Sequence, residues 1–200
     1  MKKIVPHGTM LLRYGTVLLL CLALQGCYPA AMGPTNRGVY TGRGYAQLSG
    51  RAEVYRGGRR LQISPPIRLQ RGDAVQTGAE PGARISFPNG DAVILDSNTR
   101  VHLSNVFIGF GRILARVQGL FEAENENIIA GAEGTEFVFE VNRDRDVGGT
   151  VLDGAVVCRS KRQGWRVPLN RGEIFYSRFP NMVNPGKRPA TRKELDDIRF

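Results

Sequence analysis

Short runs of alternating apolar and polar residues follow one another from about residue 45 to residue 180, with turn-forming residues between them. Regular spacing of such runs is typical of an all-β module, because side chains alternate between the two faces of a strand. No segment in this range keeps the apolar period of 3.6 residues that a helix would show. We therefore predict strands over residues 52–55, 74–77, 83–87, 92–95, 100–103, 113–117, 120–123, 128–130, 137–141, 149–152, 155–159, 165–168 and 174–177.

Glycine marks the expected turns. Asn89 and Gly90 stand between two apolar runs, a strong hairpin signal because both central residues of such a turn favour positive φ. Residues 67–75 and 167–175 share one pattern: apolar, any residue, Leu, amide, Arg, Gly, acid and two apolar residues. We interpret each as a strand–turn–strand corner that needs glycine at the bend. A structural duplication is the alternative, although the sequence between the two segments does not repeat.

The N-terminal 26 residues are typical of an export signal. Lys2, Lys3 and Arg13 precede an unbroken apolar run over residues 17–24, which is too short to span a bilayer. The sequence Leu-Gln-Gly-Cys at residues 24–27 resembles a bacterial lipobox, which implies cleavage before Cys27 and acylation of that residue. A simple signal peptide and an anchor helix are the alternatives. By analogy with lipoproteins, Tyr28 after the cysteine allows sorting to the outer membrane, with the protein facing the periplasm.

Removal of this signal changes the charge and cysteine counts. The whole chain of 200 residues carries 28 basic and 18 acidic residues, a net charge of +10. Three basic residues leave with the signal, so the mature chain has a net charge of +7. Cys21 also leaves and Cys27 is acylated, so Cys158 has no partner for an internal disulfide. An exported basic chain is expected to meet envelope anions and not nucleic acid.

The remaining chain divides into three parts. Residues 27–44 are rich in Gly and Pro and are expected to be a lipidated tether. Residues 45–180 form the predicted β domain, and residues 181–200 form a tail in which Pro185, Gly186 and Pro189 are expected to break regular structure. Thr191 and Glu194 then have the spacing of a capping box, which predicts a short C-terminal helix with an apolar stripe of Leu195, Ile198 and Phe200.

Several segments between residues 51 and 178 together resemble the periplasmic domain of the FecR family, in the order that the family shows. The match rests on residues 71–78, 89–100, 117–122, 132–139 and 151–157. Its best part is Gly-Thr-Glu-Phe-Val-Phe at residues 134–139. We assign structural roles to the signature residues, which are Gly72, Asp73, Gly90, Gly134, Thr135, Phe137, Gly154 and Gly172.

This resemblance implies an all-β fold, a twisted, solenoid-like or folded-over antiparallel sheet, with a short C-terminal helix. It also implies a role in periplasmic signalling, since family members couple an outer-membrane receptor to a cytoplasmic anti-sigma segment. We expect neither a cytoplasmic domain nor a spanning helix in this chain. Direct control of a sigma factor is therefore not expected.

Residues that could carry chemistry are few and scattered. His102 lies alone in an expected strand, without the nearby Cys or acids that a zinc site needs. Cys158 ends an apolar run, is expected to be buried and has no evident base beside it. Glu122, Glu124 and Glu126 alternate and indicate a solvated strand face. The spacing of Asn142, Asp144, Asp146 and Asp153 partly imitates a calcium loop, but Val147 stands where glycine is needed. We predict no enzyme activity, no metal and no cofactor.

Six arginines gather near the start of the domain, and a solvated face is the first interpretation of this basic cluster. Binding of lipid headgroups, lipopolysaccharide or peptidoglycan acids is the alternative. The six are Arg51, Arg56, Arg59, Arg60, Arg68 and Arg71. Together these observations predict a non-catalytic envelope lipoprotein that binds a protein or peptidoglycan. The alternative function is an accessory of periplasmic signal transduction that works through a separate receptor or regulator.

Overall fold

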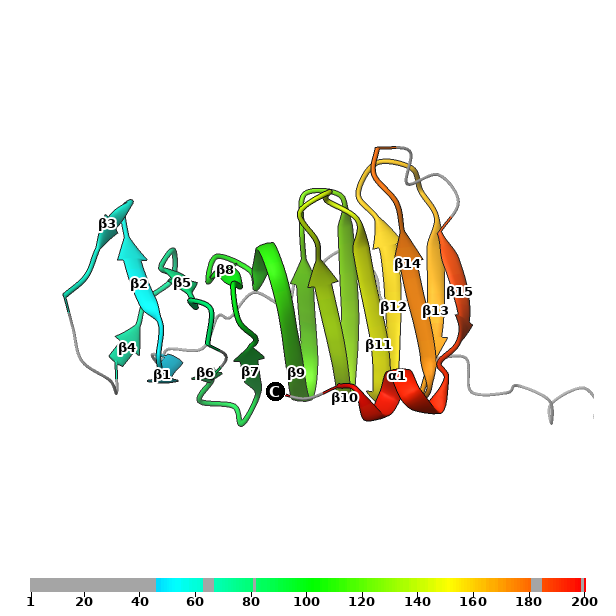
Figure 1. Cartoon of the computed structure of the whole chain (residues 1–200), viewed down its shortest axis with the longest axis horizontal. Helices are drawn as coiled ribbons and strands as arrows, with labels where there is room; N and C mark the ends of the chain where they lie inside the picture. Colours follow the sequence, from blue (N-terminus) through cyan, green and yellow to red (C-terminus); the bar gives the residue numbers. More distant parts are fainter. Residues whose placement is uncertain (1–45, 63–66, 81, 181–184, 199) are drawn as a thin grey trace, which may run out of the picture. The chain divides into compact units, whose positions relative to one another are not determined.

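The computed structural model describes residues 46–62, 67–80, 82–180, 185–198 and 200 (Figure 1). These residues form antiparallel strands and one short C-terminal helix, so the all-β prediction is confirmed. The elements are β1 (Ala46–Gly50), β2 (Glu53–Arg56), β3 (Arg59–Arg60), β4 (Ile67–Leu69), β5 (Ala74–Gln76), β6 (Ala83–Ser86), β7 (Ala92–Leu95), β8 (Arg100–His102), β9 (Phe107–Glu124), β10 (Ile128–Val141), β11 (Val147–Asp153), β12 (Ala155–Ser160), β13 (Arg166–Asn170), β14 (Glu173–Ser177), β15 (Gly186–Pro189) and α1 (Arg192–Asp196).

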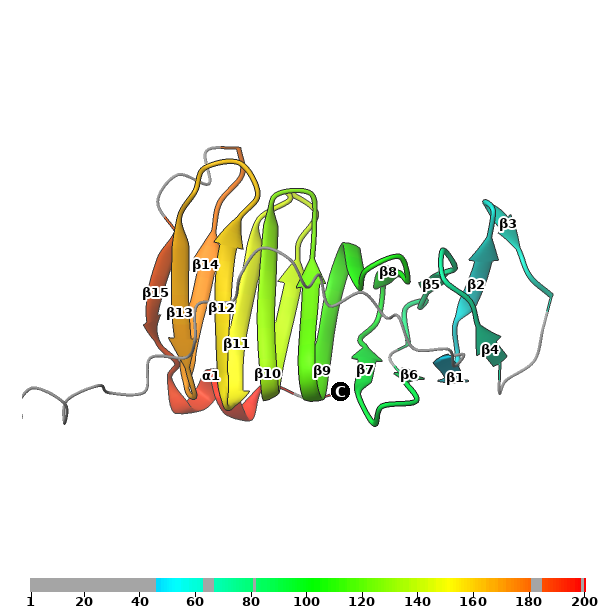
Figure 2. The same cartoon turned by 180° about the vertical axis from the view of Figure 1, so that it is seen from behind.

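The strands form one open sheet that folds over itself into two layers. Layer A follows the order β15-β14-β11-β10-β9-β7-β6-β1-β4. Layer B contains β3-β2-β5-β8 beside the start of β9, and β13-β12 beside the start of β10. Figures 1 and 2 view the two layers from opposite sides. Over the described residues the sheet stays open.

Strands β9 and β10 belong to both layers because each of them bends. Residues 113–116 of β9 pair with β7 in layer A, whereas residues 120–124 pair with the first half of β10 in layer B. The second half of β10 returns to layer A beside β11, after a bulge between Glu133 and Thr135. We predicted two short strands in place of each long one. Gly119 and Gly134 lie between the predicted strands, and in the structure each lies within a continuous strand that bends.

The core lies between the layers and is built from cross-strand rows of apolar side chains. In layer A one row crosses seven strands in register, and all of its members are at most 7% exposed. It runs Ile67, Leu48, Ile85, Val93, Ala115, Phe137, Val151. In layer B a buried row runs Val54, Val75, Val101, Ile108. Both rows belong to one continuous cluster, so burial of apolar surface holds the layers together.

The turn between β6 and β7 confirms a hairpin at Asn89-Gly90, with different geometry from the expected one. Gly90 N–H donates to the carbonyl of Phe87 at 3.1 Å, and Phe87 N–H donates to the carbonyl of Asp91 at 2.9 Å. Only Gly90 has a positive φ, of 91°. This is a three-residue hairpin loop in which Pro88 and Asn89 form the turn and Gly90 forms the bulge.

The C-terminal tail contains more structure than its prolines and glycines predicted. Residues 186–189 form β15, which pairs with β14 along the edge of layer A. Proline is tolerated there because an edge strand has one side without a partner. The expected break at Gly186 and Pro189 is therefore wrong.

Helix α1 follows β15 and is capped as predicted. Thr191 Oγ1 accepts a hydrogen bond from Glu194 N–H, and Glu194 Oε2 accepts one from Thr191 N–H. Figure 1 shows α1 crossing the ends of the strands of layer A. Phe200 lies beyond it, with its ring 5.0 Å from the guanidinium carbon of Arg112 on β9.

Candidate functional site

The signature residues Gly72 and Asp73 form a corner between β4 in layer A and β5 in layer B. Gly72 has a φ of 90°, and the Asp73 carboxylate accepts a hydrogen bond from Gln70 N–H at 2.8 Å. Both Asp73 oxygens also accept from the Arg56 guanidinium at 2.8 Å, in the bidentate geometry that favours arginine. Asp73 is fully buried. The ion pair therefore joins β2 to the corner, and its role is structural.

The second corner of the repeated pattern lies between β13 and β14 and has the same local geometry. Gly172 has a φ of 79°, and Glu173 Oε2 accepts a hydrogen bond from Asn170 N–H at 2.7 Å. Lys187 on β15 takes the place of Arg56, with its Nζ 2.8 Å from Glu173 Oε2. Each segment is thus a glycine corner between the layers, as we interpreted it.

Gly134, Thr135 and Gly154 meet where β10 and the β11–β12 connection both change layers. The Thr135 hydroxyl lies 2.9 Å from the carbonyl oxygen of Ala155 and accepts from Ala155 N–H at 3.3 Å. A side chain on Gly154 would place its Cβ 2.7 Å from Thr135 Oγ1. Phe137 lies in the core, edge-on to Phe121 at 6.2 Å. These contacts hold the change of layer in place and are structural.

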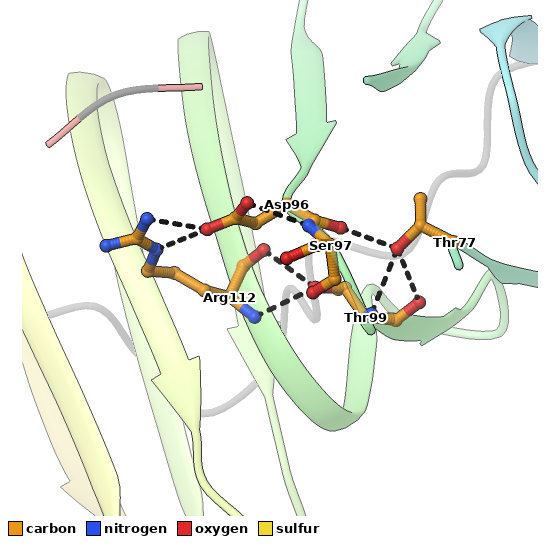
Figure 3. Close-up of polar contacts among 5 residues, drawn as sticks. All are labelled: Thr77, Asp96, Ser97, Thr99 and Arg112. Atoms are coloured by element: carbon orange, nitrogen blue, oxygen red, sulfur yellow. Dashed lines mark hydrogen bonds and ion pairs between the residues drawn. The ribbon is translucent and has the colours of Figure 1, made fainter. Parts of the chain in front are cut away.

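A polar cluster ties the crossing from β7 to β8 to strand β9 (Figure 3). Thr77 Oγ1 donates to the Asp96 carbonyl at 2.5 Å and accepts from Thr99 N–H at 2.9 Å. Thr99 Oγ1 accepts from Arg112 N–H at 3.0 Å, and the Arg112 guanidinium pairs with the Asp96 carboxylate at 2.5 Å. Figure 3 shows the side chains turned toward one another, so this cluster also serves the fold.

The outward side of β2, β5, β8 and the start of β9 carries a different set of side chains. Register places Glu53 beside Gln76 and Gln76 beside Arg100, while His102 lies beside Phe107. We call this surface the aromatic–polar face. It consists of Glu53, Tyr55, Gln76, Arg100, His102 and Phe107.

Arg100 lies at the centre of the aromatic–polar face and contacts three of its members. Its Nη1 donates to Gln76 Oε1 at 2.8 Å, and its Nε lies 3.4 Å from His102 Nε2. Its guanidinium carbon is 5.0 Å from the centre of the Tyr55 ring, within the range of a cation–π contact. Partial burial, with the charge of Arg100, lowers the pKa of His102. These contacts hold the guanidinium in one orientation.

The two ends of the face are also held by side-chain contacts. Tyr55 O–H donates to Glu53 at 2.5 Å, and this hydrogen bond raises the pKa of the tyrosine. Arg60 pairs with the same glutamate at 2.9 Å. At the other end Phe107 packs edge-on against His102, with a centroid distance of 6.0 Å.

Two grooves adjoin the face at Glu53. The larger has a volume of about 550 Å³ and is lined by residues 50–53 and 76–78. The smaller has a volume of about 290 Å³ and is lined by residues 52, 53 and 60–62. Glu53 lines both grooves. The arrangement provides aromatic surface, hydrogen-bonding groups and an oriented cation beside a depression, and it contains no nucleophile paired with a base.

The residues that we singled out for chemistry lie apart from one another. Cys158 is buried on β12, as predicted, and burial raises the pKa of its thiol to about 12. Two neighbouring cations have acidic partners of their own: Arg159 pairs with Glu122 at 2.9 Å, and Lys161 pairs with Glu124 at 2.7 Å. Glu126 lies in the following turn and is exposed. Glu122 and Glu124 thus form ion pairs along a strand face, and Glu126 does not belong to that face because β9 ends at Glu124.

The calcium-like pattern belongs to the turn between β10 and β11. Asn142 Oδ1 accepts from Asp146 N–H at 2.9 Å, and Asp146 Oδ1 accepts from Phe179 N–H at 2.8 Å. Asp153 lies at the far end of β11, near Arg171. Within the described ranges, no three His, Cys, Asp or Glu residues gather as a metal site would require.

The six arginines of the basic cluster differ in their partners. Arg51 pairs with Glu80, Arg56 with Asp73 and Arg60 with Glu53. The other three, Arg59, Arg68 and Arg71, are exposed on different elements. Three of the six arginines are therefore engaged in local ion pairs.

Cys27 lies outside the described residues, as do the predicted signal and tether. In the described part of the chain no helix has the length and apolar character needed to cross a membrane.

Comparison with known proteins shows similarity in fold. No protein-family model matches the sequence. No curated protein matches it either. Two crystal structures from Parabacteroides distasonis ATCC 8503, each described as a "putative anti-sigma factor", are similar to the chain, with TM-scores of 0.54 and 0.53 at 14% and 15% identity. In each case the match covers 62% of this chain and 62% of the other chain. At this identity the likeness shows that part of the β fold is shared.

Proposed function

We propose that this chain is a non-catalytic lipoprotein of the bacterial cell envelope whose FecR-type β domain recognises a protein or a cell-wall component. The aromatic–polar face carries the proposal, because it combines oriented polar groups with aromatic surface beside two grooves. Aromatic residues and arginine are enriched at recognition surfaces. The buried state of Cys158 and the ion pairs of Glu122 and Glu124 support a binding role over a catalytic one.

The lipid anchor is the first part of the proposal to test. Cys27→Ala should abolish incorporation of a labelled fatty acid into the full chain, and Cys158→Ala should leave it unchanged. In cells the Cys27→Ala protein should move from the membrane fraction to the soluble periplasmic fraction. Equal labelling of both variants would overturn the lipoprotein assignment.

The binding role is tested by site-specific photocrosslinking in cells that make the full-length protein. A photoreactive residue at position 110 lies beside the aromatic–polar face, where Phe110 is 37% exposed and opposes Arg100. The matched control is position 84, on the outward side of β6 in layer A, where Arg84 is exposed. We expect defined crosslinked products from position 110 and none from position 84. The absence of products, together with no retention on isolated peptidoglycan, would contradict a recognition role.

A second candidate function is an accessory role in periplasmic signal transduction, through a separate receptor or regulator. Similarity in fold to the two structures from P. distasonis favours it. Deletion of the gene should then change the transcription of a defined set of genes, and the full-length protein should restore it. Unchanged transcription in the deletion strain would remove this candidate.

A further inference from the structure

We infer that the aromatic–polar face binds peptidoglycan, whose glycan strands carry peptide stems with free carboxylates, and that Arg100 contacts a stem carboxylate. This inference rests on the cell-wall branch of the proposed function. It adds the chemistry of the ligand and the residue that contacts the negative charge of that ligand.

The first observation is that Arg100 has no acidic partner among the residues that the structure describes. Its contacts are with the neutral groups of Gln76, His102 and Tyr55. Other partly buried arginines of the domain each meet a carboxylate, as Arg56 meets Asp73 and Arg112 meets Asp96. A half-buried guanidinium that is oriented by neutral groups has donors left for an anion, and arginine suits carboxylates well.

The second observation is the charge around Arg100. Glu53 lies near it on the same face, but the Arg60 guanidinium is only 2.9 Å from the Glu53 carboxylate. At the far end Lys161 pairs with Glu124 at 2.7 Å. On the described part of this face, the charge of Arg100 is therefore the one that no ion pair neutralises, and it favours an anionic ligand.

The third observation concerns the kind of anionic ligand. An extended peptide would gain most of its affinity by pairing with an open strand edge. Strands β2, β5 and β8 have neighbours on both sides, so no such edge crosses the face. Recognition there depends on side chains, and the aromatic rings of Tyr55 and Phe107 can take the C–H surfaces of a sugar. Glu53 and Gln76 at the groove can exchange hydrogen bonds with its hydroxyl groups.

The test is co-sedimentation of the purified full-length protein, in detergent, with three insoluble glycans. Peptidoglycan sacculi carry carboxylates, sacculi whose carboxylates have been amidated do not, and chitin is an uncharged glycan. We expect Arg100→Gln to weaken binding to untreated sacculi by about tenfold, in line with the loss of a charge-assisted contact. The matched control is Arg84→Gln, which removes the same charge from an exposed strand residue in layer A and should change binding less than twofold.

Amidated sacculi should bind the wild-type protein about tenfold more weakly than untreated sacculi, and Arg100→Gln should add no further loss on them. Unchanged thermal unfolding of Arg100→Gln would show that the variant is folded. Equal binding of Arg100→Gln and wild type, or of amidated and untreated sacculi, overturns the inference and leaves wall binding intact. Failure of the wild-type protein to sediment with sacculi overturns the inference as well. Crosslinking from position 110 then decides whether a protein-binding function remains.

Discussion

The two glycine corners of the repeated sequence pattern have the same backbone geometry in different surroundings. Gly72 and Gly172 have φ values of 90° and 79°, and in each corner the following acid accepts the N–H of the residue three positions before it. The Asp73 side chain is only 1% exposed, whereas the Glu173 side chain is 23% exposed. The motif thus determines the turn, and the packing around it determines how much the acid contributes to stability.

The largest expected effect comes from the buried acid. Asp73→Ala should lower the free energy of unfolding by about 3 kcal/mol, because it removes the acceptor of the Arg56 pair and of Gln70 N–H. Urea unfolding of the full chain measures this change. Arg71→Ala is the control, since Arg71 is exposed in the same turn, and it should cost less than about 0.5 kcal/mol. Similar costs for the two variants would contradict a special role for Asp73.

The backbone requirement should be equal in the two corners. Gly72→Ala and Gly172→Ala should each cost about 1 kcal/mol, because an L side chain is strained at these φ values although both sites have open space around them. Gly78→Ala is the control, at a position with open space and without a left-handed φ. It should be neutral or slightly stabilising. Costs that differ by more than about 1 kcal/mol between the two corners would show that their backbone requirements are not the same.

The half-buried Glu173 should contribute less than the buried Asp73. Glu173→Gln is expected to cost about 0.5 kcal/mol, because its pair with Lys187 remains partly in water. A double-mutant cycle with Lys187→Met isolates the pair from the other contact of Lys187, which donates to the Pro168 carbonyl at 2.8 Å. A coupling as large as the cost of Asp73→Ala would remove the contrast between the two corners.

Acid should erase the small contribution of Glu173. Burial raises its pKa, but hydrogen bonds from Lys187 and Asn170 N–H outweigh that effect and hold the pKa below its ordinary value of 4.5. The stabilisation is therefore complete above the unfolded-state pKa and is lost as the pH falls through the folded-state pKa. The difference in unfolding free energy between wild type and Glu173→Gln should shrink from pH 7 to pH 3. A difference that grew toward pH 3 would contradict this assignment.

Local pattern was sufficient to predict much of the fold. Alternation located β7 at Ala92–Leu95 with its observed bounds, and the capping box located the start of α1. Glycine was more difficult to interpret. Gly134 bends a strand without ending it, and Gly186 lies within β15 under the ring of Tyr176, where a Cβ would overlap that ring. A glycine alone does not say whether the chain turns, bends or makes room for a neighbour.

The aromatic–polar face could not be predicted from local pattern. Tyr55 and Arg100 are 45 positions apart in the printed sequence, and the register of β2, β5 and β8 brings them together. The basic cluster shows the converse, because arginines that are close in sequence have separate partners such as Glu80 and Asp73. A spacing pattern finds sites within one element, while this site depends on the pairing of distant strands.

Strands β9 and β10 each contribute to both layers, and this has a consequence for how the domain comes apart. Because one continuous backbone crosses between the layers, neither layer can be removed without breaking hydrogen bonds in the other. The described domain should therefore lose its structure in a single cooperative transition. Its strand pairings join residues far apart in sequence, so it should also fold slowly for its size.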